Sequence, residues 1–235
     1  GDLFEGLSVW EDEAYRQIQG TYPVIFLSFA DVKADNIQDA RFQVKVKISE
    51  LFDQNTYLLD SNVLSDNEKD IFKNITMYMD DALCCSAVNI MCRYMQRYYN
   101  KKVIVLLDEY DTPMQEAYIH GYWDEFTAFL RSIFNATFKT NPYLERAVMT
   151  GITRVSKESM FSDLNNLNVV TTTSDEYSSC FGFTEEEVFD SLDAFGLSDK
   201  KQEVKKWYDG FTFGSHKDIY NPWSVTSYLD KKRIA

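Results

Sequence analysis

The sequence predicts an α/β fold in which helices flank a parallel sheet and a small helical subdomain follows. Two continuous apolar runs, "PVIFLSF" at 23–29 and "VIVLL" at 103–107, are typical of strands that are covered on both faces. A third, "RAVMTGI" at 146–152, follows the break at Asn141-Pro142. Helical periodicity fills the intervals between them, and this alternation of strand and helix indicates a parallel sheet.

The helices of this core are predicted from apolar spacing and from caps. Between 36 and 52 the apolar residues recur every three or four positions, and Ser65 with Glu68 forms a capping box that begins a second helix. A further helix ends near Asn100, directly before the second strand. After the acidic turn at 108–111, another helix places Phe126 and Ile133 on its core side.

The chain changes character in its last quarter. "NVVTTT" at 168–173 is β-branched enough to be one more strand, which places the α/β core at 1–180. From 181 to 235 we expect a helical subdomain of short helices and turns without a strand. Its features are a capping box at Thr184 and Glu187, a turn at Asp209-Gly210, and an N-cap followed by proline at Asn221-Pro222.

Composition excludes several classes of function. The net charge of −13, from 37 acidic and 24 basic residues, argues against broad binding to a nucleic-acid backbone. Three of the four cysteines lie in one apolar helical stretch and none forms a CxxC pair, which favours reduced, buried thiols in a cytoplasmic protein. His120 and His216 are too far apart in sequence to indicate a metal site. No apolar run of about 18 residues is present that could span a membrane.

The most specific stretch is "VIVLLDEYDTP" at 103–113, where a buried strand ends in acid. Ligands of doubly wound sheets bind beyond the carboxyl ends of the strands, so Asp108 faces that crevice. This is the layout of a Walker B strand, in which one acid holds Mg²⁺ and its neighbour polarises the attacking water. We assign Asp108 to the metal and Glu109 to the water, while Asp111 caps or shapes the following turn. The simpler alternative is a strand that ends at the solvent.

Six segments together resemble the AAA-ATPase-like proteins, P-loop ATPases close to the STAND and archaeal-type ATPases that are often fused to a PD-(D/E)XK-like nuclease domain. The segments occur in order along nearly the whole chain. They are "PVIFLSF", "VIVLLDEYDTPMQEA", "TGITRVSKESMFSDLNNLNVV", "FGFTEEEV", "WYDGFTFG" and "IYNPWSV". The resemblance implies a P-loop NTPase-like sheet, with ATP and Mg²⁺ as ligands of the full-length protein. It also implies nucleic acid as a partner through a fused nuclease domain.

The resemblance also assigns residues after the third strand. Thr150 and Arg154 match the position of a sensor that reads the γ-phosphate, and a guanidinium suits phosphate oxygens. A structural salt bridge is the alternative for Arg154. Lys157, Ser159 and Asn165-Asn166 could line the same crevice. Helix capping is the alternative for the serine, and a turn is the favoured interpretation of the asparagines. We therefore assign Lys157 as a nucleotide contact.

One required motif is missing. A P-loop ATPase needs GxxxxGK[ST], yet none of the nine glycines is followed by lysine. In the resembling family this Walker A loop precedes the "LFEGL" segment, so we expect an N-terminally truncated fragment that is inactive alone. We also expect a gap in the sheet beside 146–152, which 168–173, a terminal segment or another chain fills, the last giving self-association.

Two other functions remain open. The chain could be a non-catalytic protein-interaction module with an acidic surface. In that case Trp207, Tyr208 and Trp223 form an aromatic core or packing surface, with base stacking as the alternative. A metal nuclease built on Asp108, Glu109 and Asp111 is the third candidate, which the lack of a basic track disfavours. The leading hypothesis is an ATPase whose nucleotide cycle acts as a switch on a C-terminal effector or nuclease domain.

Overall fold

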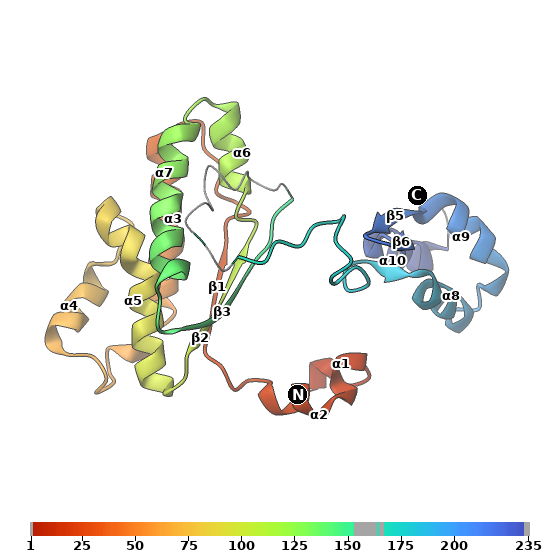
Figure 1. Ribbon diagram of the computed structural model, residues 1–235, viewed down its shortest axis with the longest axis horizontal. Helices are drawn as coiled ribbons and strands as arrows, with labels where there is room; N and C mark the ends of the chain where they lie inside the picture. The colour runs from red at the N-terminus through yellow and green to blue at the C-terminus, as the bar shows by residue number, and fades with distance from the viewer. Residues whose placement is uncertain (1, 153–163, 165–166, 233–235) are drawn as a thin grey trace. The chain divides into compact units, whose positions relative to one another are not determined.

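The computed structural model describes residues 2–152, 164 and 167–232 (Figure 1). The chain divides into two compact units, Gly1–Leu167 and Asn168–Ala235, and each unit has its own cluster of buried apolar side chains. The sequence places the change of character near residue 181, whereas the structure divides the chain after Leu167. The segment 168–180 therefore belongs to the second unit.

The first unit is built on a three-stranded parallel sheet in the order β1-β2-β3. The strands are β1 (Val24–Ser28), β2 (Val103–Asp108) and β3 (Leu144–Met149). All three predicted strands are confirmed, with the third beginning two residues earlier. The register pairs Ser28 with Asp108 and Leu107 with Met149, so the carboxyl ends of the three strands lie side by side.

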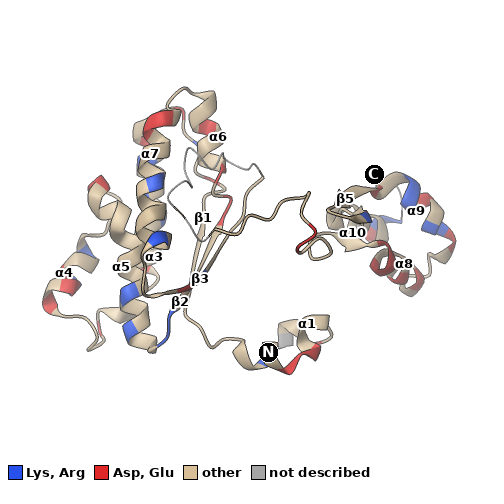
Figure 2. Ribbon diagram, in the orientation of Figure 1, with Lys and Arg blue, Asp and Glu red and all other residues tan. Residues whose placement is uncertain are grey.

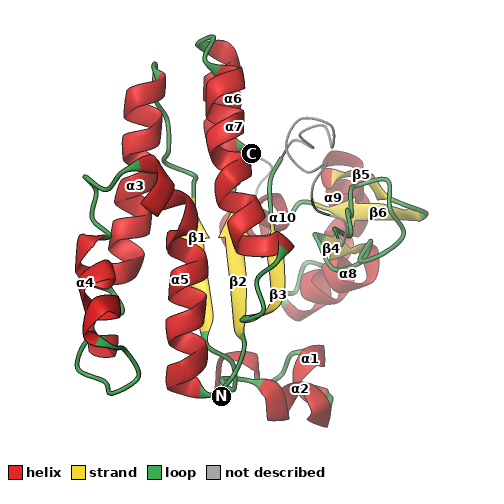
Figure 3. Ribbon diagram, turned by 60° about the vertical axis from the view of Figure 1, so that its left-hand side comes forward, coloured by secondary structure: helices red, strands yellow, loops and turns green. Residues whose placement is uncertain are grey.

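Helices pack against one face of this sheet. The helices of the unit are α1 (Ser8–Glu11), α2 (Glu13–Ile18), α3 (Ile37–Asp53), α4 (Asp66–Asn74), α5 (Asp81–Tyr99), α6 (Thr112–Ile119) and α7 (Trp123–Phe134). Helices α3, α5 and α7 lie on the same side of the strands (Figures 1 and 3). The predicted capping box at Ser65 and Glu68 begins α4, and Asn100 ends α5 in a left-handed conformation.

The opposite face of the sheet exposes apolar side chains. Burial alternates along β1 and β2, with Ile25 and Val105 buried under the helices. On the other face Val24, Phe26 and Val148 are 47%, 60% and 49% exposed. The expectation that these strands are covered on both faces is therefore wrong for the residues that the structure describes. A continuous apolar run cannot specify how many faces the same chain covers, because that depends on segments distant in sequence.

The second unit combines helices with an antiparallel sheet in the order β4-β6-β5 (Figure 3). Its elements are β4 (Phe183–Thr184), α8 (Glu185–Ala194), α9 (Lys201–Tyr208), β5 (Asp209–Phe213), β6 (His216–Tyr220) and α10 (Pro222–Lys231). The capping box at Thr184 and Glu187 begins α8 as predicted. The expectation of a region without strands is wrong. Asp209-Gly210 begins a strand, and the hairpin turns instead at Gly214, where φ is +55°.

Residues 168–173 do not form the expected strand, and they do not pair with β3. Thr171 and Ser174 instead bond to each other through backbone and side chain, with Thr171 N–H donating to Ser174 Oγ at 3.1 Å. Asn168 donates its side-chain amide to Glu176. Such local bonds compete with a sheet ladder, so β-branched composition alone overpredicted a strand here.

The distribution of charge and the burial of the cysteines agree only in part with what the composition predicts. Acidic and basic residues lie on helices of both units, and half of the residues of α8 are acidic (Figure 2). Cys84 and Cys92 are buried, and burial raises their pKa values to about 12 and about 11. Cys180 is exposed, so the prediction of a buried thiol is wrong there.

Every helix in the described part of the chain is too short or too polar to cross a bilayer.

Candidate functional site

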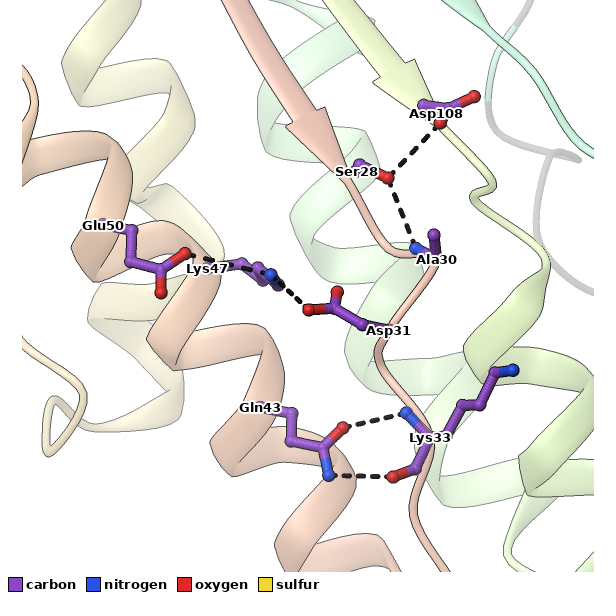
Figure 4. A network of polar contacts seen from close by, with 8 residues as sticks. All are labelled: Ser28, Ala30, Asp31, Lys33, Gln43, Lys47, Glu50 and Asp108. Carbon is purple, nitrogen blue, oxygen red and sulfur yellow. Dashed lines mark hydrogen bonds and ion pairs between the residues drawn. The ribbon is translucent and has the colours of Figure 1, made fainter.

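Asp108 lies where the carboxyl ends of all three parallel strands meet. Its Oδ1 accepts a hydrogen bond from Thr150 Oγ1 at 2.6 Å. Its Oδ2 accepts one from Ser28 Oγ at 3.3 Å, which Figure 4 shows. Ser28 ends β1 and Thr150 directly follows β3. Two neighbouring strand ends therefore hold both oxygens of the carboxylate, one on each side.

Glu109 turns the chain away from the strand. Its φ is +50°, a left-handed conformation that costs a non-glycine residue about 1 kcal/mol. Thr112 bonds back to it twice, with its N–H donating to the Glu109 carbonyl and its Oγ1 donating to Glu109 Oε2 at 2.8 Å. The second acid of the pair thus sits on a strained turn that α6 stabilises.

Asp111 is fully buried and holds the exit of β3. Its Oδ1 accepts from the Ile152 N–H at 3.3 Å, and its Oδ2 accepts from Gln115 Nε2 at 3.0 Å. Asp111 is the N-cap residue of α6 but its side chain makes no capping bond, so of the two predicted roles capping is wrong, while the bond from Gln115 of α6 agrees with the shaping of the turn. Its role is a bridge between the β2–α6 turn and the segment after β3.

Gly151 permits this close approach. A Cβ on Gly151 would lie 2.4 Å from Asp111 Oδ1 and 2.8 Å from Tyr110 Cε1, closer than any real Cβ contact. The Tyr110 N–H also donates to the Thr150 carbonyl at 3.1 Å. The position therefore needs glycine for space, which keeps Thr150 within reach of Asp108.

The loop that follows β1 connects this strand end to the helical layer. Ser28 Oγ accepts from the Ala30 N–H at 3.4 Å, and Gln43 of α3 bonds to both the N–H and the carbonyl of Lys33 at 2.8 Å (Figure 4). Lys47 pairs with Asp31 at 2.7 Å. That bond lowers the pKa of Asp31 and raises the pKa of Lys47.

The predicted site residues are thus only partly brought together. Asp108 and Thr150 bond directly, and Glu109 follows them on the turn. Arg154 and Lys157 lie outside the described residues, as do Ser159 and Asn165-Asn166, so their roles stay predictions. Ser28 was not identified from the sequence as a site residue. Ligands bind where parallel strands end at one edge of a sheet, and this rule, which identified Asp108, also applies to Ser28.

The three acids do not form a metal cluster of their own. Among residues 2–152, 164 and 167–232, no group of three or more histidine, cysteine, aspartate or glutamate side chains is arranged to hold a metal ion. Asp111 is instead bonded to Ile152 and Gln115. The described residues therefore give no support to a nuclease built on Asp108, Glu109 and Asp111, which the sequence already disfavours.

The aromatic motifs of the second unit are largely exposed. Trp207 and Trp223 are 60% and 80% exposed, so the expectation that they form a core is wrong, while their role as a packing surface stays a prediction. Tyr208 does pack against the second hydrophobic cluster, with its ring centroid 5.9 Å from that of Tyr228. Asn221 caps α10, and proline follows it as predicted.

Comparison with known proteins bears on the first unit. The family model described as predicted AAA-ATPase matches residues 1–161. The chain is 30% identical over 136 residues to an uncharacterized protein in the vnfD 5' region of Azotobacter chroococcum mcd 1, a match that covers 57% of this chain and 26% of that protein. The matched part thus spans about a quarter of the curated relative. No solved structure is significantly similar. Because the family match takes in the strand ends around Asp108 and more than half of the sequence, the chain belongs to the predicted AAA-ATPase family.

Proposed function

We propose that the first unit supplies the magnesium- and water-positioning part of an ATP-hydrolysing site. Asp108 holds Mg²⁺ through a water molecule and Glu109 orients the attacking water. The Thr150 hydroxyl, whose single proton is donated to Asp108 in this structure, turns to donate it to the γ-phosphate when the nucleotide binds. The observation that carries the proposal is the convergence of hydroxyl groups from two neighbouring strand ends on both oxygens of Asp108.

The donor set around Asp108 fits this ion. Mg²⁺ prefers oxygen ligands and retains several of its waters. Among the described residues each carboxylate oxygen accepts one side-chain hydrogen bond and has a further lone pair, so Asp108 can accept from metal-bound water while Ser28 fixes its orientation. Bound Mg²⁺ would neutralise charge on the phosphate oxygens.

The strain at Glu109 supports a functional role for that residue. Left-handed backbone at a non-glycine residue persists where the surroundings impose it, and such residues concentrate at active sites. The Thr112 hydroxyl occupies one lone pair of Glu109 Oε2, and the other carboxylate oxygen can accept a proton from water. Glu109 is thus suited to orient and polarise a nucleophile.

Hydrolysis also needs a phosphate cradle, and residues 1–235 contain no GxxxxGK[ST] motif. In this proposal the cradle comes from outside this sequence, and Arg154 and Lys157 add phosphate contacts. The nucleotide state then acts on a C-terminal effector or nuclease domain of the whole protein. The bonds from Asp108 through Ser28 and the following loop to Gln43 on α3 support such a switch.

The test is Asp108→Asn in the complete protein, with Glu145→Gln on the exposed surface of β3 as the charge-matched control. We expect Asp108→Asn to reduce Mg²⁺-dependent ATP hydrolysis about a hundredfold or more. Glu109→Gln should retain Mg²⁺-ATP binding in calorimetry and lose turnover, and circular dichroism should show all variants folded. Normal hydrolysis by a folded Asp108→Asn variant would refute the assignment.

A second candidate function is a non-catalytic protein-interaction module. The exposure of Trp207 and Trp223 favours it, because tryptophan is enriched at the energetic centres of interfaces. One experiment, which measures association with and without nucleotide, distinguishes the two candidate functions. Association that is independent of nucleotide and unaffected by Glu109→Gln belongs to the interaction module, whereas association that follows the nucleotide state belongs to the ATPase switch.

A further inference from the structure

The side chain of Glu109 can orient an attacking water only if its own carboxylate is held in place. A glutamate side chain rotates about several bonds, whereas a group that acts on a nucleophile must keep one geometry. In the described part of the chain, a hydrogen bond from the first residue of α6, Thr112, supplies such a constraint.

Thr112 holds Glu109 at two points. Its N–H donates to the Glu109 carbonyl at 3.2 Å, and its Oγ1 donates to Glu109 Oε2 at 2.8 Å. The first bond closes the turn in which the φ of Glu109 is +50°. The second bond fixes the far end of the side chain. Because a hydroxyl donates a single proton, this bond occupies Oε2 and leaves Oε1 to accept from a water molecule.

Thr112 is itself rigidly placed. Its branched β-carbon restricts rotation about χ1, and Pro113 follows it with a fixed φ. Pro113 and Met114 are buried. The N–H groups of Met114 and Gln115 both donate to the Asp111 carbonyl at 3.0 Å, which anchors the first turn of α6. The hydroxyl of Thr112 therefore has a fixed position, and this position defines where the Glu109 carboxylate lies.

We propose that Thr112 is a positioning residue for Glu109, and that its hydroxyl holds Oε2 so that Oε1 faces the attacking water. The inference rests on the proposed function, because it assigns Thr112 a role only through Glu109. Thr112 touches neither the nucleotide nor the water in this assignment. It accelerates the chemical step and leaves the binding of Mg²⁺-ATP unchanged, since the orientation of Glu109 matters in the transition state.

A purely structural role of the same hydroxyl predicts a different result. If the bond only stabilises the first turn of α6, its loss reduces the fraction of folded protein. Nucleotide binding and turnover then fall in parallel, whatever residue stands at position 109. The ratio of the two effects, and their dependence on Glu109, therefore distinguishes the two roles.

The test compares Thr112→Val, Thr112→Ala and Thr112→Ser in the complete protein. The first retains the branched shape without the hydroxyl, the second removes both, and the third retains the hydroxyl. We expect Thr112→Val and Thr112→Ala to lower kcat for Mg²⁺-ATP hydrolysis about ten- to hundredfold, because a hydrogen bond to a charged group is lost. KM should change by less than about twofold, and Thr112→Ser should keep kcat within about threefold of the parent.

Thr226→Val is the matched control. Thr226 is an exposed residue of α10 in the second unit, and its hydroxyl donates to the Pro222 carbonyl at 2.8 Å. The substitution removes a hydroxyl and a hydrogen bond of similar length, as Thr112→Val does. It should leave kcat and KM unchanged.

A double-mutant cycle with Glu109→Gln completes the test. Because Thr112 acts through the Glu109 carboxylate, adding Thr112→Val to Glu109→Gln should lower kcat by less than about twofold more. Additive losses, a Thr112→Ser variant as slow as Thr112→Val, or normal kcat in folded Thr112→Val would overturn the inference while the proposed function stands. Circular dichroism checks folding, and unfolding of both Thr112→Val and Thr112→Ala would show the structural role instead. Full turnover by folded Glu109→Gln would overturn the inference and the proposed role of Glu109 together.

Discussion

Gly151 is the residue at which sequence and packing are most tightly coupled. The β3 exit passes Asp111 so closely that any side chain at this position collides with a buried carboxylate. The same approach keeps Thr150 within hydrogen-bond distance of Asp108. The geometry of the candidate site therefore depends on Gly151, a residue without a side chain.

We expect Gly151→Ala to lower the free energy of unfolding of the first unit by about 1–3 kcal/mol, since Asp111 and Tyr110 must move apart. Gly210→Ala is the matched control, because its Cβ would meet no atom within 4 Å. That control should be neutral or slightly stabilising. Urea denaturation followed by circular dichroism measures both, and equal stability of the two variants would contradict the close approach at Gly151.

At the scale of elements, Glu68 ties two helices together. It completes the capping box that begins α4, and its Oε1 accepts from Arg97 of α5 at 2.7 Å. The hydrogen bond from Arg97 is the largest cause that lowers the pKa of Glu68 from its ordinary 4.5 to about 2. One carboxylate thus both starts a helix and attaches it to the core.

The depressed pKa gives a stability that depends on pH. Ionised Glu68 stabilises the folded chain above pH 4.5, and this contribution is lost as the pH falls from about 4.5 towards about 2. Glu68→Gln retains the capping pattern and removes the charge. We expect it to lose about 1 kcal/mol at pH 7 and to flatten the dependence of unfolding free energy on pH in that window. A variant with the same acid profile as the parent would exclude this role.

At the scale of the whole molecule, two hydrophobic clusters stabilise two separate units. Leu130 and Leu192 are both fully buried in amphipathic helices, the first in the cluster of the first unit and the second in that of the second. Because the clusters share no residue, the effects of substitutions in them should be independent.

Leu130→Ala and Leu192→Ala should each cost about 2–5 kcal/mol in one unit and leave the other unchanged. Hydrogen exchange measured unit by unit checks this, with Leu3→Ala as a control because that side chain is 89% exposed. Loss of protection in both units from either substitution would show that the chain unfolds as one cooperative body.

The helix caps could be predicted from the sequence, whereas the exposure of each face of the sheet could not. Caps at Ser65, Thr184 and Asn221 were predicted correctly, since each depends on contacts within four residues. The exposure of Phe26 was not predicted, because it depends on which distant segments reach that face. The strands β5 and β6 escaped prediction for a similar reason, as Asp209-Gly210 has the composition of a turn and is made a strand by pairing with β6.

The sequence by itself determined the three parallel strands, the helices between them and the position of Asp108 at a strand end, because periodicity and local capping encode these features. Only the tertiary structure decided that Ser28 and Thr150 hold Asp108, that Asp111 is a buried bridge, and that Arg41 and Lys45 share one carboxylate. Ser28 is 80 residues from Asp108 and Thr150 is 42 residues from it. Such contacts arise from strand order and register, which bring distant residues together and which no local pattern records.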